Sequence, residues 1–282
     1  MRKMFVATRL IPLGRRRRHA RIRMWIALTV IAILVVVPYA FASFLDPYGT
    51  NVQHVLEGPS GQFWFGTDKV GSDVLSRTLW AARTDLPLAL GATALALAIG
   101  APLGAWFGYS TKLGERAMRA IDAFQALPLL IIILALVALS GGETYMVAVA
   151  IVLYAAPAFI RVVRSEVLAV STSRYVEAAR AFGVSTPTIL RRHVLPNVAE
   201  LVLAQTALIA ASSFLAISAL SFLGVGVTQP TPTWGGMVAD GVGPLISGIW
   251  WPVLFPGAAI FSCVIAFNAL ANAARELSGG RA

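Results

Sequence analysis

Six apolar stretches, each about as long as the hydrocarbon core of a bilayer is thick, constrain the fold of this chain most strongly. A helix needs roughly 20 apolar residues to cross that core, where every backbone N–H and C=O group must find its partner inside the protein. We therefore expect an all-α membrane protein, a bundle of six transmembrane helices. The six stretches cover residues 24–44, 86–109, 121–140, 144–163, 198–225 and 249–271.

The composition excludes a soluble domain and several kinds of site. Hydrophobic residues make up 57% of the chain and charged residues 13%, whereas about a quarter of the residues of a globular protein are charged. The net charge of +10 does not indicate a nucleic-acid groove, because nine Lys and Arg residues precede the first stretch and most others lie in short loops. The single cysteine, Cys263, lies inside an apolar stretch and the three histidines are scattered, so we expect no internal disulfide and no metal site.

The Lys and Arg residues predict how the bundle is oriented. Cytoplasmic loops of membrane proteins carry an excess of these residues. If the basic segment 1–23 is cytoplasmic, all but three of the 23 Lys and Arg residues lie on the cytoplasmic side. The exceptions are Lys69, Arg77 and Arg83. We therefore expect both termini, including the tail 273–282, in the cytoplasm, residues 45–85 as an extracytoplasmic loop, and residues 86–272 as the transmembrane core.

The first stretch, residues 24–44, has two readings. Its basic flank, its apolar centre and Ala40-Phe41-Ala42 also fit a signal peptide with its cleavage site. Its length is near the roughly 20 residues that cross a bilayer, so we interpret it as a retained first span. We expect the preceding run Arg15–Arg18 to anchor it on the cytoplasmic side, with recognition of anionic lipid or of a partner as the alternative.

Glycine and proline predict how the spans pack and bend. Glycine recurs at every fourth residue in the second span, which leaves one side of that helix bare and permits close packing of another helix. These glycines are Gly100, Gly104 and Gly108. We expect Pro128 to bend the third span and Pro157 to interrupt the fourth.

From Ser72 onward the apolar residues share one side, and we interpret this segment as a short helix on the membrane surface, separate from the second span.

The polar segment between the fourth and fifth spans, residues 165–197, carries the strongest functional signal. Ser173 suits the N-cap of a short helix, and Gly183 suits its end, because glycine takes the left-handed cap conformation without strain. Thr186-Pro187 suits the start of a second short helix that Pro196 would close. The number of preceding spans puts this segment in the cytoplasm. We expect a stiff helical elbow there, suited to docking a protein from the aqueous phase.

Three anchors within this elbow stand at fixed spacing: Glu177-Ala178-Ala179, then Gly183, then Leu195-Pro196. This pattern resembles the EAA loop of ABC-importer permeases. His193 stands where the general pattern has isoleucine, but the run from Arg192 to Asn197 is similar to the dipeptide, oligopeptide and nickel branch of that family.

Two further segments resemble the same branch. Residues 64–77 are similar except at Ser72, where the branch usually has arginine, and residues 220–235 are similar around the end of the fifth span. The resemblance extends over roughly residues 63–277.

The resemblance implies a permease subunit of a binding-protein-dependent ABC importer in a bacterial inner membrane, a transport subunit and not an enzyme. Its implied cargo is a peptide or a related small solute, although metal chelates and siderophores are also carried within the family. The implied partners are a homologous permease that completes a heterodimer, two cytoplasmic ATP-binding subunits or domains, an extracytoplasmic solute-binding protein and membrane lipid, without nucleic acid.

The resemblance also implies how the chain is driven. Since the sequence has no GxxxxGK[ST] phosphate loop, ATP and Mg would be bound by the partner subunits, and this chain would bind no cofactor. The segment from Glu177 to Gly183 would form a coupling helix seated in the ATPase. The residues implied in coupling are Glu177, Ala178, Ala179, Arg180, Gly183, Leu195 and Pro196.

Three other functions are compatible with the spans. The main alternative is an ion-gradient carrier without an ATPase, but such carriers usually place ionisable residues at mid-membrane, and here the span centres hold weakly polar groups such as Gln205 and Asn268. These two side chains either form hydrogen bonds between helices or line the substrate path. An intramembrane protease is suggested only by Gly58-Pro59-Ser60-Gly61, and no span contains a histidine to act as base. A structural scaffold leaves the spacing within the elbow unexplained.

Overall fold

The computed structural model describes residues 13–41, 44, 46–141, 143, 145–171, 176, 182, 184, 188, 195–227 and 229–278. In these ranges the regular structure is helical, and the one β-type pairing is an isolated antiparallel bridge between Thr67 and Asp73. The prediction of an all-α protein is confirmed for this part of the chain.

Five helices are long and apolar enough to cross a membrane, and a bent pair of helices is the candidate for a sixth span. The five are α1 (Leu13–Ala40), α2 (Val74–Tyr109), α5 (Tyr145–Ser171), α8 (Leu195–Phe222) and α10 (Trp251–Ser278). The bent pair consists of α3 (Thr111–Gln125) and α4 (Leu129–Leu139), and the chain bends by 80° between them. The 3₁₀ helix η2 (Val52–His54) and the helix α9 (Trp234–Ile246) lie between spans.

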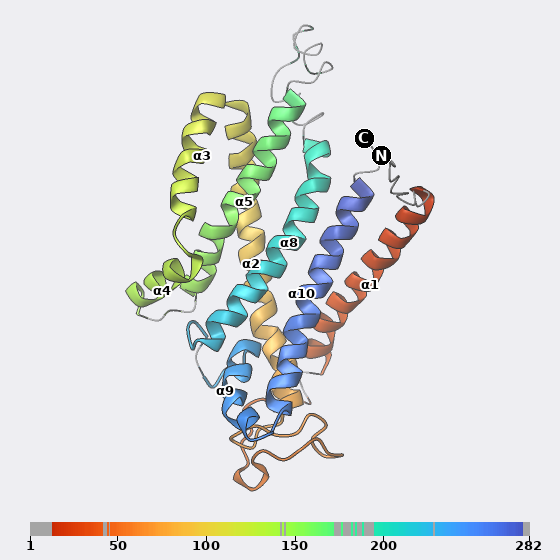
Figure 1. Ribbon diagram of the computed structural model, residues 1–282, viewed down its shortest axis with the longest axis vertical. Coiled ribbons are helices and arrows are strands. Elements are labelled where there is room, and N and C mark those ends of the chain that lie inside the picture. Colours follow the sequence, from red (N-terminus) through yellow and green to blue (C-terminus); the bar gives the residue numbers. More distant parts are fainter. Residues whose placement is uncertain are drawn as a thin grey trace, which may run out of the picture.

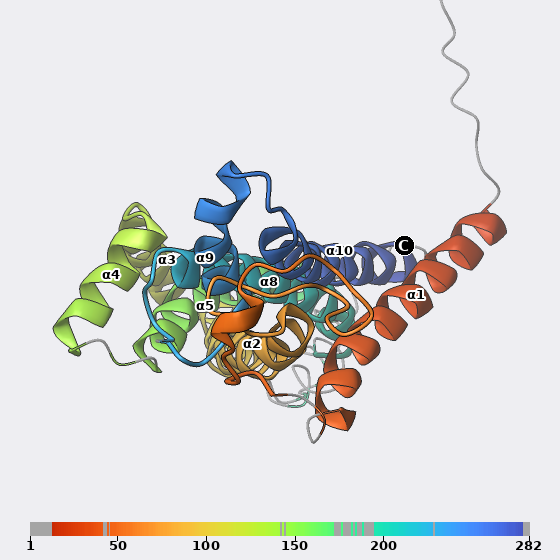
Figure 2. The same ribbon diagram turned by 90° about the horizontal axis from the view of Figure 1, so that it is seen from below.

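The long helices α2, α5, α8 and α10 run side by side, with α1 next to α10 on one flank and α3 and α4 on the other (Figures 1 and 2). One end of the molecule carries the start of α1, the end of α5, the start of α8 and the end of α10, and we call it the terminal end (Figure 1). The opposite end carries residues 46–73 and α9, and we call it the α9 end. Ser171 and Leu195, which flank most of the predicted elbow, therefore both lie at the terminal end.

The helices α2 and α5 approach each other at backbone distance along one row of glycines. We call Gly100, Gly104 and Gly108 the glycine stripe. A Cβ atom added at Gly104 would lie 2.7 Å from the carbonyl oxygen of Ile160, and one added at Gly108 would lie 2.7 Å from the Cβ atom of Val167. No side chain fits at these distances, so the missing side chains let the two helices pack directly against each other.

The helix α2 corrects the expectation of a separate surface helix after Ser72. Residues 74–109 form one continuous helix of 36 residues that passes through Pro87. At 1.5 Å per residue such a helix is about 54 Å long, more than the roughly 30 Å of a hydrocarbon core. Asp73 caps the first turn, because its carboxylate accepts the backbone N–H groups of Leu75 and Ser76. The first turns of α2 thus extend beyond a bilayer without a break in the helix.

Trp234, the first residue of α9, joins α9 to α2 through two hydrogen bonds. Its backbone N–H donates to Oδ2 of Asp85 at 2.9 Å, and its indole Nε1–H donates to the carbonyl oxygen of Thr78 at 2.8 Å. Asp85 is fully buried, and a buried carboxyl group is tolerated where it accepts hydrogen bonds. The ring of Trp234 packs against Phe214 of α8, which in turn packs against Phe267 of α10. These contacts hold the buried carboxyl group of Asp85 between α2 and α9.

The three prolines behave differently from one another. The chain bends at Pro128 as expected, since proline disfavours helical backbone in the residue before it, and α4 begins directly after it. The prediction that Pro157 interrupts the fourth span is wrong, because α5 is continuous around it. Pro196 was expected to close a helix but is itself helical, next to the first described residue of α8.

Replacing Gly104 with alanine should destabilise the protein, because the added Cβ atom would collide with the backbone of α5 and overpacking costs about 1–3 kcal/mol. Gly91→Ala is the matched control in the same helix, since a Cβ atom there meets nothing within 4 Å and alanine favours a helix by about 1 kcal/mol. We expect only Gly104→Ala to lower the midpoint of thermal unfolding in detergent. Equal midpoints for the two variants would contradict the close packing of α2 and α5.

Two substitutions of Asp85 should show how much its hydrogen bond to Trp234 stabilises the fold. In Asp85→Ala the buried N–H of Trp234 loses its acceptor, which costs about 1–3 kcal/mol. In Asp85→Asn the amide oxygen still accepts that N–H, and a neutral group is easier to bury. We expect the alanine variant to unfold at a lower temperature than the asparagine variant. If asparagine is as damaging as alanine, the hydrogen bond to Trp234 is not what makes Asp85 necessary for the fold.

Candidate functional site

The predicted coupling residues Glu177, Ala178, Ala179, Arg180 and Gly183 lie outside the residues that the structure describes. Leu195 and Pro196 are the first two residues of α8. What the structure does describe is how the elbow begins and three residues that it exposes, Phe182, Val184 and Thr188.

Val176, directly before the predicted coupling residues, is fully buried. It packs in a cluster with Val163 and Val167 of α5 and Val198 of α8, which we call the valine cluster. Val163 and Val167 are also the residues that a Cβ atom on Gly104 and Gly108 would touch, at 2.9 and 2.7 Å. The elbow is therefore fixed at Val176 to the same part of α5 that packs against α2.

Phe182, six residues further along, is 87% exposed. A large aromatic side chain that stands free in water is unfavourable by about 1.5–3 kcal/mol relative to its buried state, so it favours contact with another surface. Sequence reasoning overlooked both Val176 and Phe182. The available signal was their position, since Val176 precedes Glu177 and Phe182 precedes Gly183.

The two residues assigned to a substrate path, Gln205 and Asn268, lie on α8 and α10 and are both partly buried. The side-chain amide of Asn268 donates to the carbonyl oxygen of Val264 in its own helix, at 2.9 Å. Neither residue lines a described cavity.

A concavity of about 130 Å³ lies instead between α3, the start of α4, α5 and the middle of α8. Its polar lining includes Gln125, whose amide donates to the carbonyl oxygen of Tyr154 at 3.2 Å, and the hydroxyl groups of Ser212 and Ser213. Thr93 of α2 lies behind it, with its Oγ1 3.4 Å from Oγ of Ser213. This lining is uncharged and mostly apolar, which suits contact with a small solute or with another helix. These residues were missed because they lie on three different helices.

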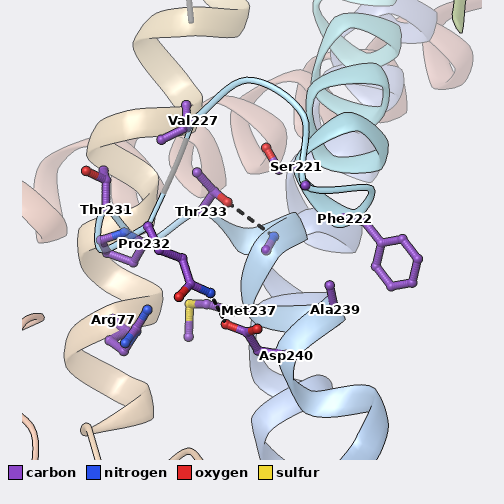
Figure 3. Close-up of a pocket in the computed structure, with 13 residues that line it drawn as sticks. Arg77, Ser221, Phe222, Val227, Thr231, Pro232, Thr233, Met237, Ala239 and Asp240 are labelled. Carbon is purple, nitrogen blue, oxygen red and sulfur yellow. Dashed lines mark hydrogen bonds between the residues drawn. The ribbon is translucent and has the colours of Figure 1, made fainter. Parts of the chain in front are cut away.

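A second cavity, of about 220 Å³, lies at the α9 end between α2, the connection from α8 to α9, and α9 itself (Figure 3). Two charged side chains line it, Arg77 and Asp240, and each forms an ion pair with a residue outside the lining. Nη1 of Arg77 lies 3.3 Å from Oδ2 of Asp68, and Nζ of Lys69 lies 2.7 Å from Oδ1 of Asp240. Gln229 also donates to Oδ2 of Asp240 at 2.9 Å (Figure 3).

Ser72, where the resembled branch usually has arginine, lies in the turn that carries Asp68. Its backbone N–H donates to Oδ1 of Asp68 at 2.9 Å, and its side chain is buried with no hydrogen-bond partner for Oγ. The serine thus helps to hold Asp68 in place through its backbone. Among the described residues, no group of three or more His, Cys, Asp and Glu side chains is arranged to hold a metal ion.

Comparison with known proteins identifies relatives across most of the chain. A family model for "Binding-protein-dependent transport system inner membrane component" matches residues 96–280. The glutathione transport system permease protein GsiD of Escherichia coli O1:K1 / APEC is 35% identical over 265 residues, which is 92% of this chain and 87% of the relative. The dipeptide transport system permease protein DppC of Bacillus subtilis (strain 168) is 32% identical over 264 residues, 92% of this chain and 82% of the relative. The matched region contains both the glycine stripe and the whole elbow.

Proposed function

Because this chain belongs to the family of binding-protein-dependent transport system inner membrane components and is a permease subunit of an ABC importer, we propose that it forms, with a homologous permease, the path by which short peptides or a related small solute enter the cell. It is a transport subunit without a catalytic domain, and permeases of this family function in complexes with an ATPase and a binding protein. This assignment decides against an ion-gradient carrier, an intramembrane protease and a structural scaffold.

The proposed cargo class rests on the relatives. One transports glutathione and another transports dipeptides, according to their names, and each aligns with 92% of this chain. Both cargoes are short peptide-like molecules with a free carboxylate. The observation that carries the proposal is this similarity over almost the entire length, rather than over a single motif.

The proposed topology has six spans, with α3 and α4 together as the third. The start of α1, the end of α10 and both flanks of the elbow lie at the terminal end (Figure 1), and the Lys and Arg residues favour the cytoplasm for that end. The α9 end then faces outward. In this orientation the elbow between the fourth and fifth spans is exposed to a cytoplasmic ATPase.

The proposed coupling mechanism is a mechanical connection from the ATPase to the bundle. Residues 177–183 form a coupling helix in a cleft of the ATPase, and Phe182 supplies an apolar contact there. Closure of two ATPase subunits around ATP and Mg displaces the elbow, and the valine cluster passes the displacement to α5. Because binding must favour one of two discrete arrangements of the bundle, a buried connection transmits the movement better than an exposed loop.

The proposed substrate path runs along the concavity between α3, α5 and α8, with Gln205 and Asn268 as further candidates on α8 and α10. The hydroxyl and amide groups of Ser212, Ser213 and Gln125 offer a solute weak hydrogen bonds without a charge that would trap it. The glycine stripe keeps α5 against α2 while the surfaces on the other side of α5 rearrange.

Replacing Phe182 with alanine should weaken association with the ATPase by about 10- to 100-fold, which corresponds to losing roughly 1.5–3 kcal/mol of apolar contact. The matched control is Phe44→Ala, because Phe44 is 83% exposed but lies outside the elbow. We expect only Phe182→Ala to reduce co-purification of the ATPase and uptake of peptide. Equal co-purification of the ATPase with both variants would remove Phe182 from the docking surface.

Replacing Gly183 with valine should uncouple ATP hydrolysis from transport, because a β-branched residue disfavours the left-handed conformation that ends the proposed coupling helix. Insertion into the membrane should be unaffected. The measurement is the ratio of peptide taken up to ATP hydrolysed in proteoliposomes that contain the assembled importer. A normal ratio for Gly183→Val would count against a helix end at this position.

A further inference from the structure

We propose that the cavity at the α9 end binds the carboxylate end of the cargo, and that Arg77 is the residue that recognises it. This inference rests on the proposed peptide import, since it assigns to the cavity one end of such a solute. It concerns the end of the molecule opposite the elbow (Figure 1).

The size of the cavity suits one end of a peptide. Its volume of about 220 Å³ equals the space of roughly seven waters at about 30 Å³ each. Pockets that enclose a whole drug-sized ligand usually begin at about 300 Å³. The cavity therefore admits a terminal residue with its carboxylate while the rest of a peptide extends beyond it.

Arg77 borders this cavity with hydrogen-bonding capacity that the protein does not use (Figure 3). The residue is only 9% exposed, and its Nε is buried with no hydrogen-bond partner. Because Nε is closed to solvent, we place the proposed contact with a carboxylate at the Nη groups of the guanidinium. Its planar array of N–H groups matches the two oxygens of a carboxylate.

The ion pair with Asp68 does not use the full hydrogen-bonding capacity of Arg77. Asp68 lies 3.3 Å from Nη1 of Arg77, a long distance for a charge-assisted bond. The other oxygen of Asp68 accepts the backbone N–H groups of Val70 and Ser72 at 3.0 and 2.9 Å, which fixes this carboxylate in its turn. Asp68 therefore orients Arg77 from one side and leaves the guanidinium available to the cavity.

The remaining charges favour a zwitterion over a simple anion. Asp240 lines the cavity and is itself bound by Lys69 at 2.7 Å and Gln229 at 2.9 Å. The two charged side chains that line the cavity, Arg77 and Asp240, have opposite signs, so the site offers no excess of positive charge to multiply charged anions such as phosphate. A solute with one carboxylate for Arg77 and one ammonium group in the field of Asp240 suits the site, and short peptides have this chemistry.

The test is direct binding of alanylalanine and of its C-terminal amide to the full-length chain in phosphatidylcholine nanodiscs, measured by calorimetry. No binding protein or anionic lipid is present to supply a competing carboxylate. We expect the wild-type protein to bind the free acid at least tenfold more tightly than the amide. Arg77→Gln should weaken binding of the free acid at least tenfold, to the level of the amide. An undiminished preference of Arg77→Gln for the free acid would overturn the proposal.

A second variant tests the cavity without breaking the ion pair of Arg77. Ala239 of α9 lines the cavity, and Ala239→Phe should fill it and weaken binding of alanylalanine at least tenfold. Val242→Phe is the matched control, because Val242 is an exposed residue of α9 and not among those lining the cavity. Wild-type affinity in Ala239→Phe would also overturn the proposal.

Uptake by the assembled importer separates this proposal from the proposed function. If the wild-type importer does not take up dipeptides, the proposed cargo is wrong, whatever Arg77 binds in nanodiscs. If the importer takes up dipeptides and Arg77→Gln does not change the preference of the chain for the free acid, the cargo stands and the carboxylate site is wrong.

Discussion

The direct packing of α2 against α5 is the contact on which the rest of the structure depends. It exists because three glycines remove the side chains that would separate the two helices, and in lipid such close van der Waals contact replaces the hydrophobic drive that packs helices in water. The same turns of α5 supply Val163 and Val167 to the valine cluster, which buries Val176 at the start of the elbow. A continuous packed route therefore leads from α2 through α5 to the segment that resembles a coupling loop.

This route gives the two ends of the molecule a physical connection. At the α9 end, α2 carries Arg77 beside the cavity and Asp85 beneath Trp234. At the terminal end, α2 meets α5 close to the valine cluster. The helix α8 also reaches both ends, with Val198 in the valine cluster and Ser221 in the lining of the cavity. A displacement of the elbow thus acts on helices that also line the proposed carboxylate site. A change of the bundle between two discrete packings requires such a connection.

Structural features that depend on residues close together in the sequence could be predicted from local patterns. The spans followed from the length of the apolar stretches, and the four-residue spacing of glycine pointed to the side of α2 that faces α5. Contacts between segments far apart in the sequence could not be predicted from such patterns. Asp85 and Trp234 are 149 residues apart, so a carboxylate that the sequence placed at the membrane surface is in fact buried under α9. The two cavities were missed for the same reason, since each combines side chains from several helices.

The most direct test of the mechanical connection is the distance between Val184 in the elbow and Leu95 on α2, measured by double electron–electron resonance. Both side chains are exposed, and spin labels can be attached to cysteines at these positions after Cys263→Ser removes the native thiol. The measurement compares the assembled importer without nucleotide and with ATP trapped on its ATPase. A buried connection through the valine cluster and the glycine stripe predicts the same distance in both states. A distance that changes when ATP binds would show that the elbow moves independently of α2 and would contradict that connection.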